Sequence, residues 1–181
     1  YSAVGGVAGI AAEGPDAGKI LWKTSAWNHS VVAPSPVCMP DGKIFLTAGY
    51  GAGSMLLQLS ENKGEYSIAV LQQYLPKDGL ACEQQTPIYW QGHLFGVIPK
   101  DGGQLRNQFV CVDPSDCKKM VWTSGPTHRF GLGPYVMADN KFYLLDDEGT
   151  LTIISPSTSK YIQLDQAKVI QDGADAWAPI A

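Results

Sequence analysis

The sequence is poor in arginine and in long apolar runs, and these shortages exclude two classes of protein. Only two of its 13 basic residues are arginine, Arg106 and Arg129, and its 17 acidic residues give a net charge of −4. Nucleic-acid-binding surfaces need clustered positive charge, so nucleic acid is not an expected partner. No apolar stretch approaches the roughly 18 residues of a membrane-spanning helix, so no membrane span is expected. The chain begins at Tyr1 with neither a start methionine nor a signal peptide, and we interpret it as a processed chain or a piece of a longer one.

The cysteines also lack the spacing of a metal or redox motif. There is no C-x-x-C pair, which excludes a zinc ribbon or a thioredoxin-type site. Two of the four flank a five-residue turn, so a disulfide across a hairpin is geometrically allowed. Separate buried thiols are favoured, because unpaired cysteine packs as a small hydrophobe. The pairing is left open for all four: Cys38, Cys82, Cys111 and Cys117.

Long helices are not expected either. The 181 residues are 45% hydrophobic and 17% charged, which is typical of one globular domain, and they include 20 glycines and 12 prolines. No segment sustains a 3.6-residue apolar period. Short apolar runs instead recur along the chain. Four of them begin with proline, at steps of 51, 47 and 45 residues: Pro36, Pro87, Pro134 and Pro179.

Each of the first three prolines opens a unit of four predicted strands. A glycine or asparagine follows it by five or six residues and begins a second run, GKIFL, GHLFG or NKFYL. Third and fourth runs follow, with GKILW at residues 18–22 as the fourth run of an earlier unit. Four short strands in 45 to 51 residues are typical of a propeller blade. A kelch propeller is disfavoured because paired glycines are not equivalent between units, and a two-sheet sandwich does not explain the period.

The sequence therefore predicts an all-β propeller of four-stranded antiparallel blades, with about four blade equivalents in a single domain or part-domain. The first unit supplies only strands two to four, and the tail supplies only a first strand. This count fits half of an eight-bladed ring or a fragment of a larger propeller. The predicted boundaries are residues 1–30 for the first, partial blade, 31–79, 80–126 and 127–172 for three full blades, and 173–181 for the first strand of the next.

The end of each unit resembles the repeat of quinoprotein-like propellers, the PQQ-like β-propeller repeat. Residues 9–22 (GIAAEGPDAGKILW) and 112–122 (VDPSDCKKMVW) carry an acid, a turn and a strand-four tryptophan, and residues 155–163 (SPSTSKYIQ) are a fainter copy. The turn around residues 59–64 has lost the motif. Because a tryptophan offers both a large apolar face and an N–H donor, we expect Trp22 and Trp122 to pack between blades.

For a quinone dehydrogenase, the resemblance implies a calcium-bound PQQ cofactor, a stacking tryptophan, a vicinal cysteine pair and a catalytic aspartate. The sequence has no Cys-Cys pair and no assignable calcium ligands. Such enzymes use a ring of roughly eight blades, which four blade equivalents do not enclose. We therefore expect no cofactor, no metal and no catalytic residue in this chain; PQQ and calcium belong only to the alternative that it is part of a quinone- or metal-dependent oxidoreductase, similar to alcohol or sugar dehydrogenases.

The segments between blades are expected to meet at one mouth of the ring, where ligands usually bind. His29 and His128 lie at near-equivalent positions, seven and six residues before the proline of the next unit. With Arg129 beside them, the two imidazoles are candidates for an anion or carbonyl site. The alternative is that each polar side chain caps its own loop. The candidate ligand-binding residues are Asn28, His29, His128, Arg129, Asp175 and Trp177.

Three other features have a structural interpretation. His93 alternates with apolar residues and is predicted to be a half-exposed strand residue. The glycine-rich residues 49–54 precede a predicted strand rather than a helix, so we interpret them as a turn and not as a phosphate loop. Residues 146–149 (DDEG) lack the ligand spacing of an EF-hand and are predicted to form a hairpin turn.

The functional hypothesis is a non-catalytic scaffold that binds a protein or small ligand at the loop-lined mouth. A homodimer that completes the ring is ranked slightly ahead of a small ring in which the tail pairs with the chain's own first sheet. Relatives of this repeat are mostly bacterial and exported, so the resemblance implies a periplasmic or extracellular location. The low charge and the even number of cysteines agree with it.

Overall fold

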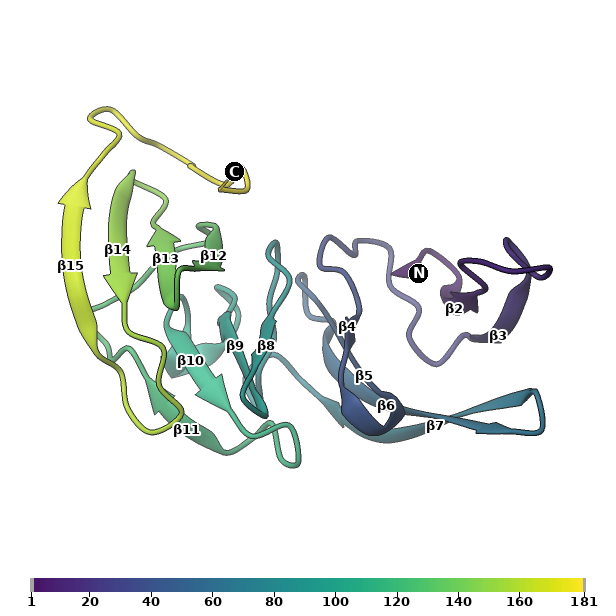
Figure 1. Ribbon diagram of the computed structural model, residues 1–181. Coiled ribbons are helices and arrows are strands. Elements are labelled where there is room, and N and C mark those ends of the chain that lie inside the picture. Colours follow the sequence, from purple (N-terminus) through teal and green to yellow (C-terminus); the bar gives the residue numbers. More distant parts are fainter. Residues whose placement is uncertain (1, 181) are drawn as a thin grey trace.

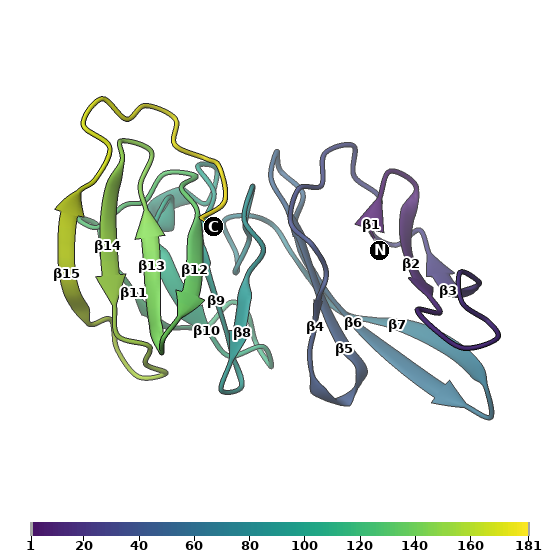
Figure 2. The same ribbon diagram turned by 45° about the horizontal axis from the view of Figure 1, so that its top comes forward.

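The computed structural model describes residues 2–180 as an all-β chain with almost no helix. Its strands form four antiparallel sheets, each a meander of strands consecutive in the chain. The only helical turns in that range are two short 3₁₀ segments, η1 (Pro40–Gly42) and η2 (Gly103–Leu105). Figures 1 and 2 show the sheets following one another along an arc, with the N-terminal sheet at one end and the C-terminal sheet at the other. No helix in the described part of the chain has the length and hydropathy needed to cross a membrane.

The first sheet has three strands and each of the other three has four, as the sequence predicts. The first consists of β1 (Ser2–Ala3), β2 (Gly6–Ile10) and β3 (Ile20–Thr24). The second consists of β4 (Val37–Cys38), β5 (Lys43–Ala48), β6 (Gly53–Asn62) and β7 (Glu65–Tyr74). The third consists of β8 (Ile88–Trp90), β9 (His93–Val97), β10 (Phe109–Val112) and β11 (Met120–Thr123). The fourth consists of β12 (Tyr135–Ala138), β13 (Lys141–Leu145), β14 (Thr150–Ile154) and β15 (Gln163–Lys168).

The core is divided into three clusters, one between each pair of neighbouring sheets. Side chains alternate across a strand, so a sheet flanked on both sides sends successive residues into different clusters. In β5, Phe45 packs toward the third sheet, whereas Ile44 and Leu46 pack toward the first. In β10, Val110 and Cys111 divide in the same way between the second and fourth sheets. The strands of the inner sheets are therefore apolar on both faces, which explains their continuous hydrophobic runs.

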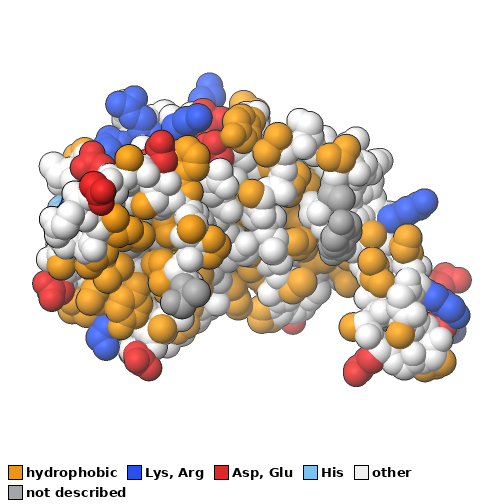
Figure 3. All heavy atoms as spheres, turned by 90° about the horizontal axis from the view of Figure 1, so that it is seen from above, with side chains coloured by type: hydrophobic (Ala, Val, Ile, Leu, Met, Phe, Trp, Pro, Cys, Tyr) orange, Lys and Arg blue, Asp and Glu red, His pale blue; other side chains and the backbone are white. Residues whose placement is uncertain are grey.

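The two end sheets each keep one face outside these clusters. On the fourth sheet, Phe142, Leu144 and Ile154 are fully buried against the third sheet. The residues that alternate with them are partly exposed and apolar, and Figure 3 shows hydrophobic side chains gathered over this C-terminal end of the molecule. They are Val136, Tyr143, Leu145, Leu151 and Ile153. Among the described residues, no core cluster joins the fourth sheet to the first.

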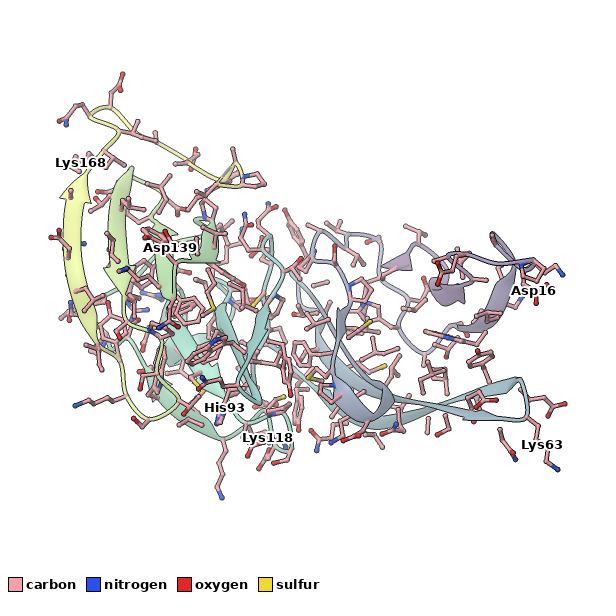
Figure 4. The ribbon with its side chains drawn as sticks, viewed as in Figure 1. Asp16, Lys63, His93, Lys118, Asp139 and Lys168 are labelled. Carbon is pink, nitrogen blue, oxygen red and sulfur yellow. The ribbon has the colours of Figure 1, made fainter. Side chains whose placement is uncertain are left out.

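The β6–β7 hairpin is the longest in the structure, with ten residues in each strand. It extends beneath the first sheet, where β7 packs against β3 and Leu59 and Ile68 join the core between the two sheets. Figure 4 shows Lys63 at its tip, far from the remaining sheets. The strand β7 runs on to Tyr74, whose side chain is buried in the core between the second and third sheets.

The expected strand in the tail is not formed. Residues 173–180, the described part of 173–181, contain no strand. The backbone N–H of Ala176 donates instead to the Asp147 carbonyl at 3.2 Å. Within the described chain β1 pairs only with β2, so the tail does not close a small ring on the first sheet. A strand is stabilised by backbone hydrogen bonds to a neighbouring strand, and no strand of the described chain pairs with residues 173–180.

A disulfide between Cys111 and Cys117 is also excluded by the fold, and all four cysteines are free thiols. Cys111 lies in the cluster between the third and fourth sheets, whereas Cys117 lies in the cluster between the second and third. The two side chains therefore occupy opposite faces of one sheet. Burial raises the pKa of both thiols to about 12.

Candidate functional site

Strand direction alternates along a meander. In each four-stranded sheet, the loop between the second and third strands and the loop that leaves the fourth strand therefore lie at the same end. Hydrogen bonds tie these loops together across sheet boundaries. The backbone N–H of Gly51 donates to Asp101 at 2.9 Å, and that of Phe130 donates to the Asn107 carbonyl at 2.7 Å. We call this set of loops, which belongs to the second, third and fourth sheets, the loop rim; it comprises residues 49–52, 75–87, 98–107, 124–134, 146–149 and 169–180.

One network of the loop rim centres on Asp147, in the β13–β14 turn. Its carboxylate accepts hydrogen bonds from the backbone N–H of Leu132 at 2.8 Å and from the indole N–H of Trp177 at 3.0 Å. The Trp177 carbonyl accepts a hydrogen bond from the Gln85 amide at 3.2 Å. A Cβ atom at Gly131 would overlap the Asp147 carboxylate, so only glycine allows this approach. The network holds four chain segments together and leaves Trp177 41% exposed.

A second feature of the loop rim is the carboxyl group of Glu83. The residue is only 4% exposed, and neither carboxyl oxygen has a hydrogen-bond partner in the described structure. The nearest cation, Lys100 Nζ, lies 3.9 Å from Oε1, on a side chain that is mostly exposed. The glycine at position 49 makes room for the Glu83 side chain, since a Cβ there would overlap it.

Burial raises the pKa of the Glu83 carboxyl above its ordinary value; the Lys100 ammonium opposes this shift, and Asp101 adds to it. Buried polar groups in folded proteins nearly always have hydrogen-bond partners, so an unpartnered carboxyl is costly. Ionisable groups whose pKa is shifted by burial and by nearby charges are typical of functional sites. The adjacent Cys82 thiol is fully buried, and its pKa is raised to about 12 by burial, so it is not a reactive nucleophile.

Most of the residues predicted to bind a ligand make local contacts instead. Asn28 accepts a hydrogen bond from the Gly5 N–H at 2.8 Å. The His29 ring packs edge-on against Trp27, with 4.3 Å between the ring centroids. The His128 ring lies 3.1 Å from the Ser124 carbonyl and packs against Tyr161. The contacts of His29 and His128 therefore belong to different sheet boundaries, and no contact in the described structure brings the two imidazoles together.

The other predicted residues divide between the loop rim and the sheet boundaries. Trp177 joins the Asp147 network, and the exposed Asp175 adopts a left-handed backbone conformation in the same segment, with a φ of 53°. Trp122 is 7% exposed in the cluster between the third and fourth sheets, and its indole N–H donates to the Ser157 carbonyl at 2.8 Å. Trp22 covers Gly9 beside the core between the first and second sheets.

The sequence interpretation missed Glu83, Lys100 and Asp147. Asp147 was noted only as part of a hairpin turn, and Glu83 follows the apolar residues 80–82 without a recognisable motif. Their burial and proximity arise from the packing of successive sheets. By contrast, the glycine-rich residues 49–52 form the β5–β6 turn, as predicted, and His93 begins β9 at the end opposite to the β9–β10 loop.

The donor set of the loop rim does not fit a calcium-bound quinone. Calcium requires six to eight oxygen ligands, usually including several carboxylates. Among residues 2–180, no three histidine, cysteine, aspartate or glutamate side chains converge as metal ligands. The Asp147 carboxylate is already bound by backbone and indole N–H groups. No step of the function proposed below is routed through such a cofactor.

Comparison of the sequence with protein-family models finds no match, and comparison with curated proteins finds none either.

Proposed function

We propose that this chain is part of a β-propeller of PQQ-like blades and acts as a non-catalytic scaffold whose ligand binds at the loop rim. The repeated motifs of the sequence and the succession of four-stranded meanders support the propeller. Rigid sheets that carry a cluster of cross-linked loops are a common platform for binding.

The observation behind this binding site is the Glu83 carboxyl, which is buried and has no hydrogen-bond partner among the described residues. The covered carboxyl oxygens become reachable only if the surrounding loops open, and a ligand that then donates hydrogen bonds to them would relieve the cost of their burial. The neighbouring Lys100 ammonium would bind an acceptor of the same ligand, and the exposed Tyr50 ring, 5.7 Å from that ammonium, would offer an apolar face. These groups suit a small polar ligand with both donors and acceptors, such as a polyol or saccharide.

The test is a thermal-shift screen of the protein with polyols and saccharides, followed by calorimetry on any compound that stabilises it. Binding to the native state must raise the melting temperature. We expect Glu83→Gln to weaken the affinity by about tenfold, the equivalent of one hydrogen bond to a charged group. The matched control is Glu61→Gln, in the exposed β6–β7 hairpin. Stabilisation by calcium with a quinone, together with a quinone absorbance band, would instead establish the oxidoreductase alternative.

The proposed ring also requires a partner for each end face. The exposed face of the fourth sheet is apolar, and the first sheet carries an open groove of about 660 Å³, lined in part by Val4, Gly6 and Ile20. The inner sheets already pack on neighbours of the same kind, so we propose that a second copy packs its first sheet on this fourth sheet. Solution mass by light scattering tests this directly. A folded species of 19.5 kDa at micromolar concentration contradicts the dimer.

A further inference from the structure

The only two arginines of the chain meet at one groove of the loop rim. The groove is open, has a volume of about 570 Å³, and lies between η2 and the loop that joins β11 to β12. Arg106 comes from the third sheet's β9–β10 loop, and Arg129 comes from the segment leading to the fourth sheet. The remaining lining residues are Gly103, Gln104 and Pro126.

Backbone carbonyls hold the Arg129 guanidinium in place. Its Nε donates to the Pro126 carbonyl at 3.0 Å, and its two terminal nitrogens donate to the carbonyls of Arg106 and Gln104. A guanidinium has five N–H donors, so two remain for a ligand. All three acceptors are neutral, and the positive charge of Arg129 is therefore not compensated by them.

The Arg106 side chain is exposed and makes no hydrogen bond or ion pair within the described structure. Its backbone is fixed, because η2 is closed by the Arg106 N–H to the Gly103 carbonyl and the Gln108 side chain binds the Gln104 carbonyl at 3.1 Å.

The charge arrangement is unusual for this chain. The sequence carries four more acids than bases, yet the ion pairs of the described residues are Lys19–Asp16 and Lys100–Glu83, and neither involves an arginine. Two cations that line one groove without a carboxylate repel each other and attract an anion. Arginine is suited to this role because its planar fork matches the oxygens of carboxylate and phosphate groups.

We propose that the groove between Arg106 and Arg129 binds an oxyanion, the carboxylate or phosphate group of a small ligand. Arg129 is the preorganised half of the site, and the exposed Arg106 closes on the anion from the opposite side. None of the residues that line this groove contacts Glu83, so failure of the Glu83 site or of ring closure leaves this proposal standing.

The test is titration with sodium phosphate and, separately, sodium acetate, followed by calorimetry and by backbone amide shifts. Ionic strength is held with sodium chloride at about 0.15 M, where the Debye length is about 8 Å, so that general screening is constant. We expect saturable binding of at least one anion, with the largest shifts at residues 103–106 and 126–129. Tighter binding of phosphate identifies a phosphate site, and tighter binding of acetate identifies a carboxylate site.

Three variants distinguish specific binding in the groove from general attraction of the anion to positive charge. Arg106→Gln removes a side chain without a partner, so the fold is retained, and the affinity is expected to fall by about tenfold, the equivalent of one charge-assisted hydrogen bond. Arg106→Lys keeps the charge but loses the fork and is expected to recover only part of this loss. Lys119→Gln, an exposed cation in the β10–β11 loop, changes the net charge equally and should leave the affinity unchanged. Absence of saturable binding of both anions, or an equal loss in Lys119→Gln, overturns the proposal.

Discussion

The strongest stability prediction concerns the two tryptophans that occupy equivalent positions in the first and third sheets. Trp122 is nearly fully buried, with ring centroids 5.9 Å from Phe95 and 5.8 Å from Phe109, and it donates its N–H to Ser157. Trp22 occupies the matching strand but is only partly buried, beside the core between the first and second sheets.

The expected magnitudes follow from this difference. Truncation of a buried large aromatic to alanine costs about 3–5 kcal/mol, and we expect this loss for Trp122→Ala. Trp122→Phe keeps most of the packing but leaves the Ser157 carbonyl without its donor, which costs about 1–3 kcal/mol. Trp22→Ala should cost about 1–2 kcal/mol, because a partly buried side chain gains roughly half of the full burial free energy.

The assay is urea denaturation followed by far-UV circular dichroism, which does not depend on the deleted fluorophore. In thermal melts each kcal/mol corresponds to about 2–4 °C for a chain of this size. A loss below about 1 kcal/mol for Trp122→Ala, or an equal loss for Trp22→Ala, would refute the idea that burial between neighbouring sheets sets the role of these tryptophans.

Two further predictions concern ionisable groups. Burial raises the folded-state pKa of Glu83, so folding favours the protonated carboxyl. The stabilisation of the folded state by this proton is fully present below the unfolded-state pKa near 4.5, and it is lost as pH rises through the folded-state pKa. Glu83→Gln should therefore become more stable relative to the parent as pH rises, by about 1.4 kcal/mol for each unit of pKa shift, and a pH-independent difference in urea melts would contradict this. Among the cysteines only Cys38 is exposed, whereas burial raises the pKa of Cys82, Cys111 and Cys117 to about 12. A thiol reagent at neutral pH should therefore label one cysteine in the native protein and four after denaturation. Mass spectrometry of the labelled protein counts the sites, and rapid native labelling of a second cysteine would show that the cores open.

The sequence by itself determined the strands of the four sheets and their order, but not the tail, where the expected strand is not formed. Proline and glycine punctuation, β-branched and aromatic runs, and the 45- to 51-residue period are local features, and they placed the strands of all four sheets within a few residues. The largest shift is in the last unit, where the apolar run KYIQL predicts a strand over residues 160–164. Tyr161 joins the core beside Trp122 instead, and β15 begins at Gln163. Packing against a neighbouring sheet overrides strand propensity there.

Only the tertiary structure decided what the loops bring together. His29 and His128 occupy equivalent places in the repeat, yet each packs at its own sheet boundary, whereas Arg106 and Arg129, 23 residues apart and without a shared motif, line one groove. The unpartnered burial of Glu83 likewise depends on the approach of Gly49 and Lys100 from other loops. A repeat specifies each sheet through interactions between near neighbours in the chain. The contacts between loops depend on how successive sheets are placed, and side chains of several segments set that placement together.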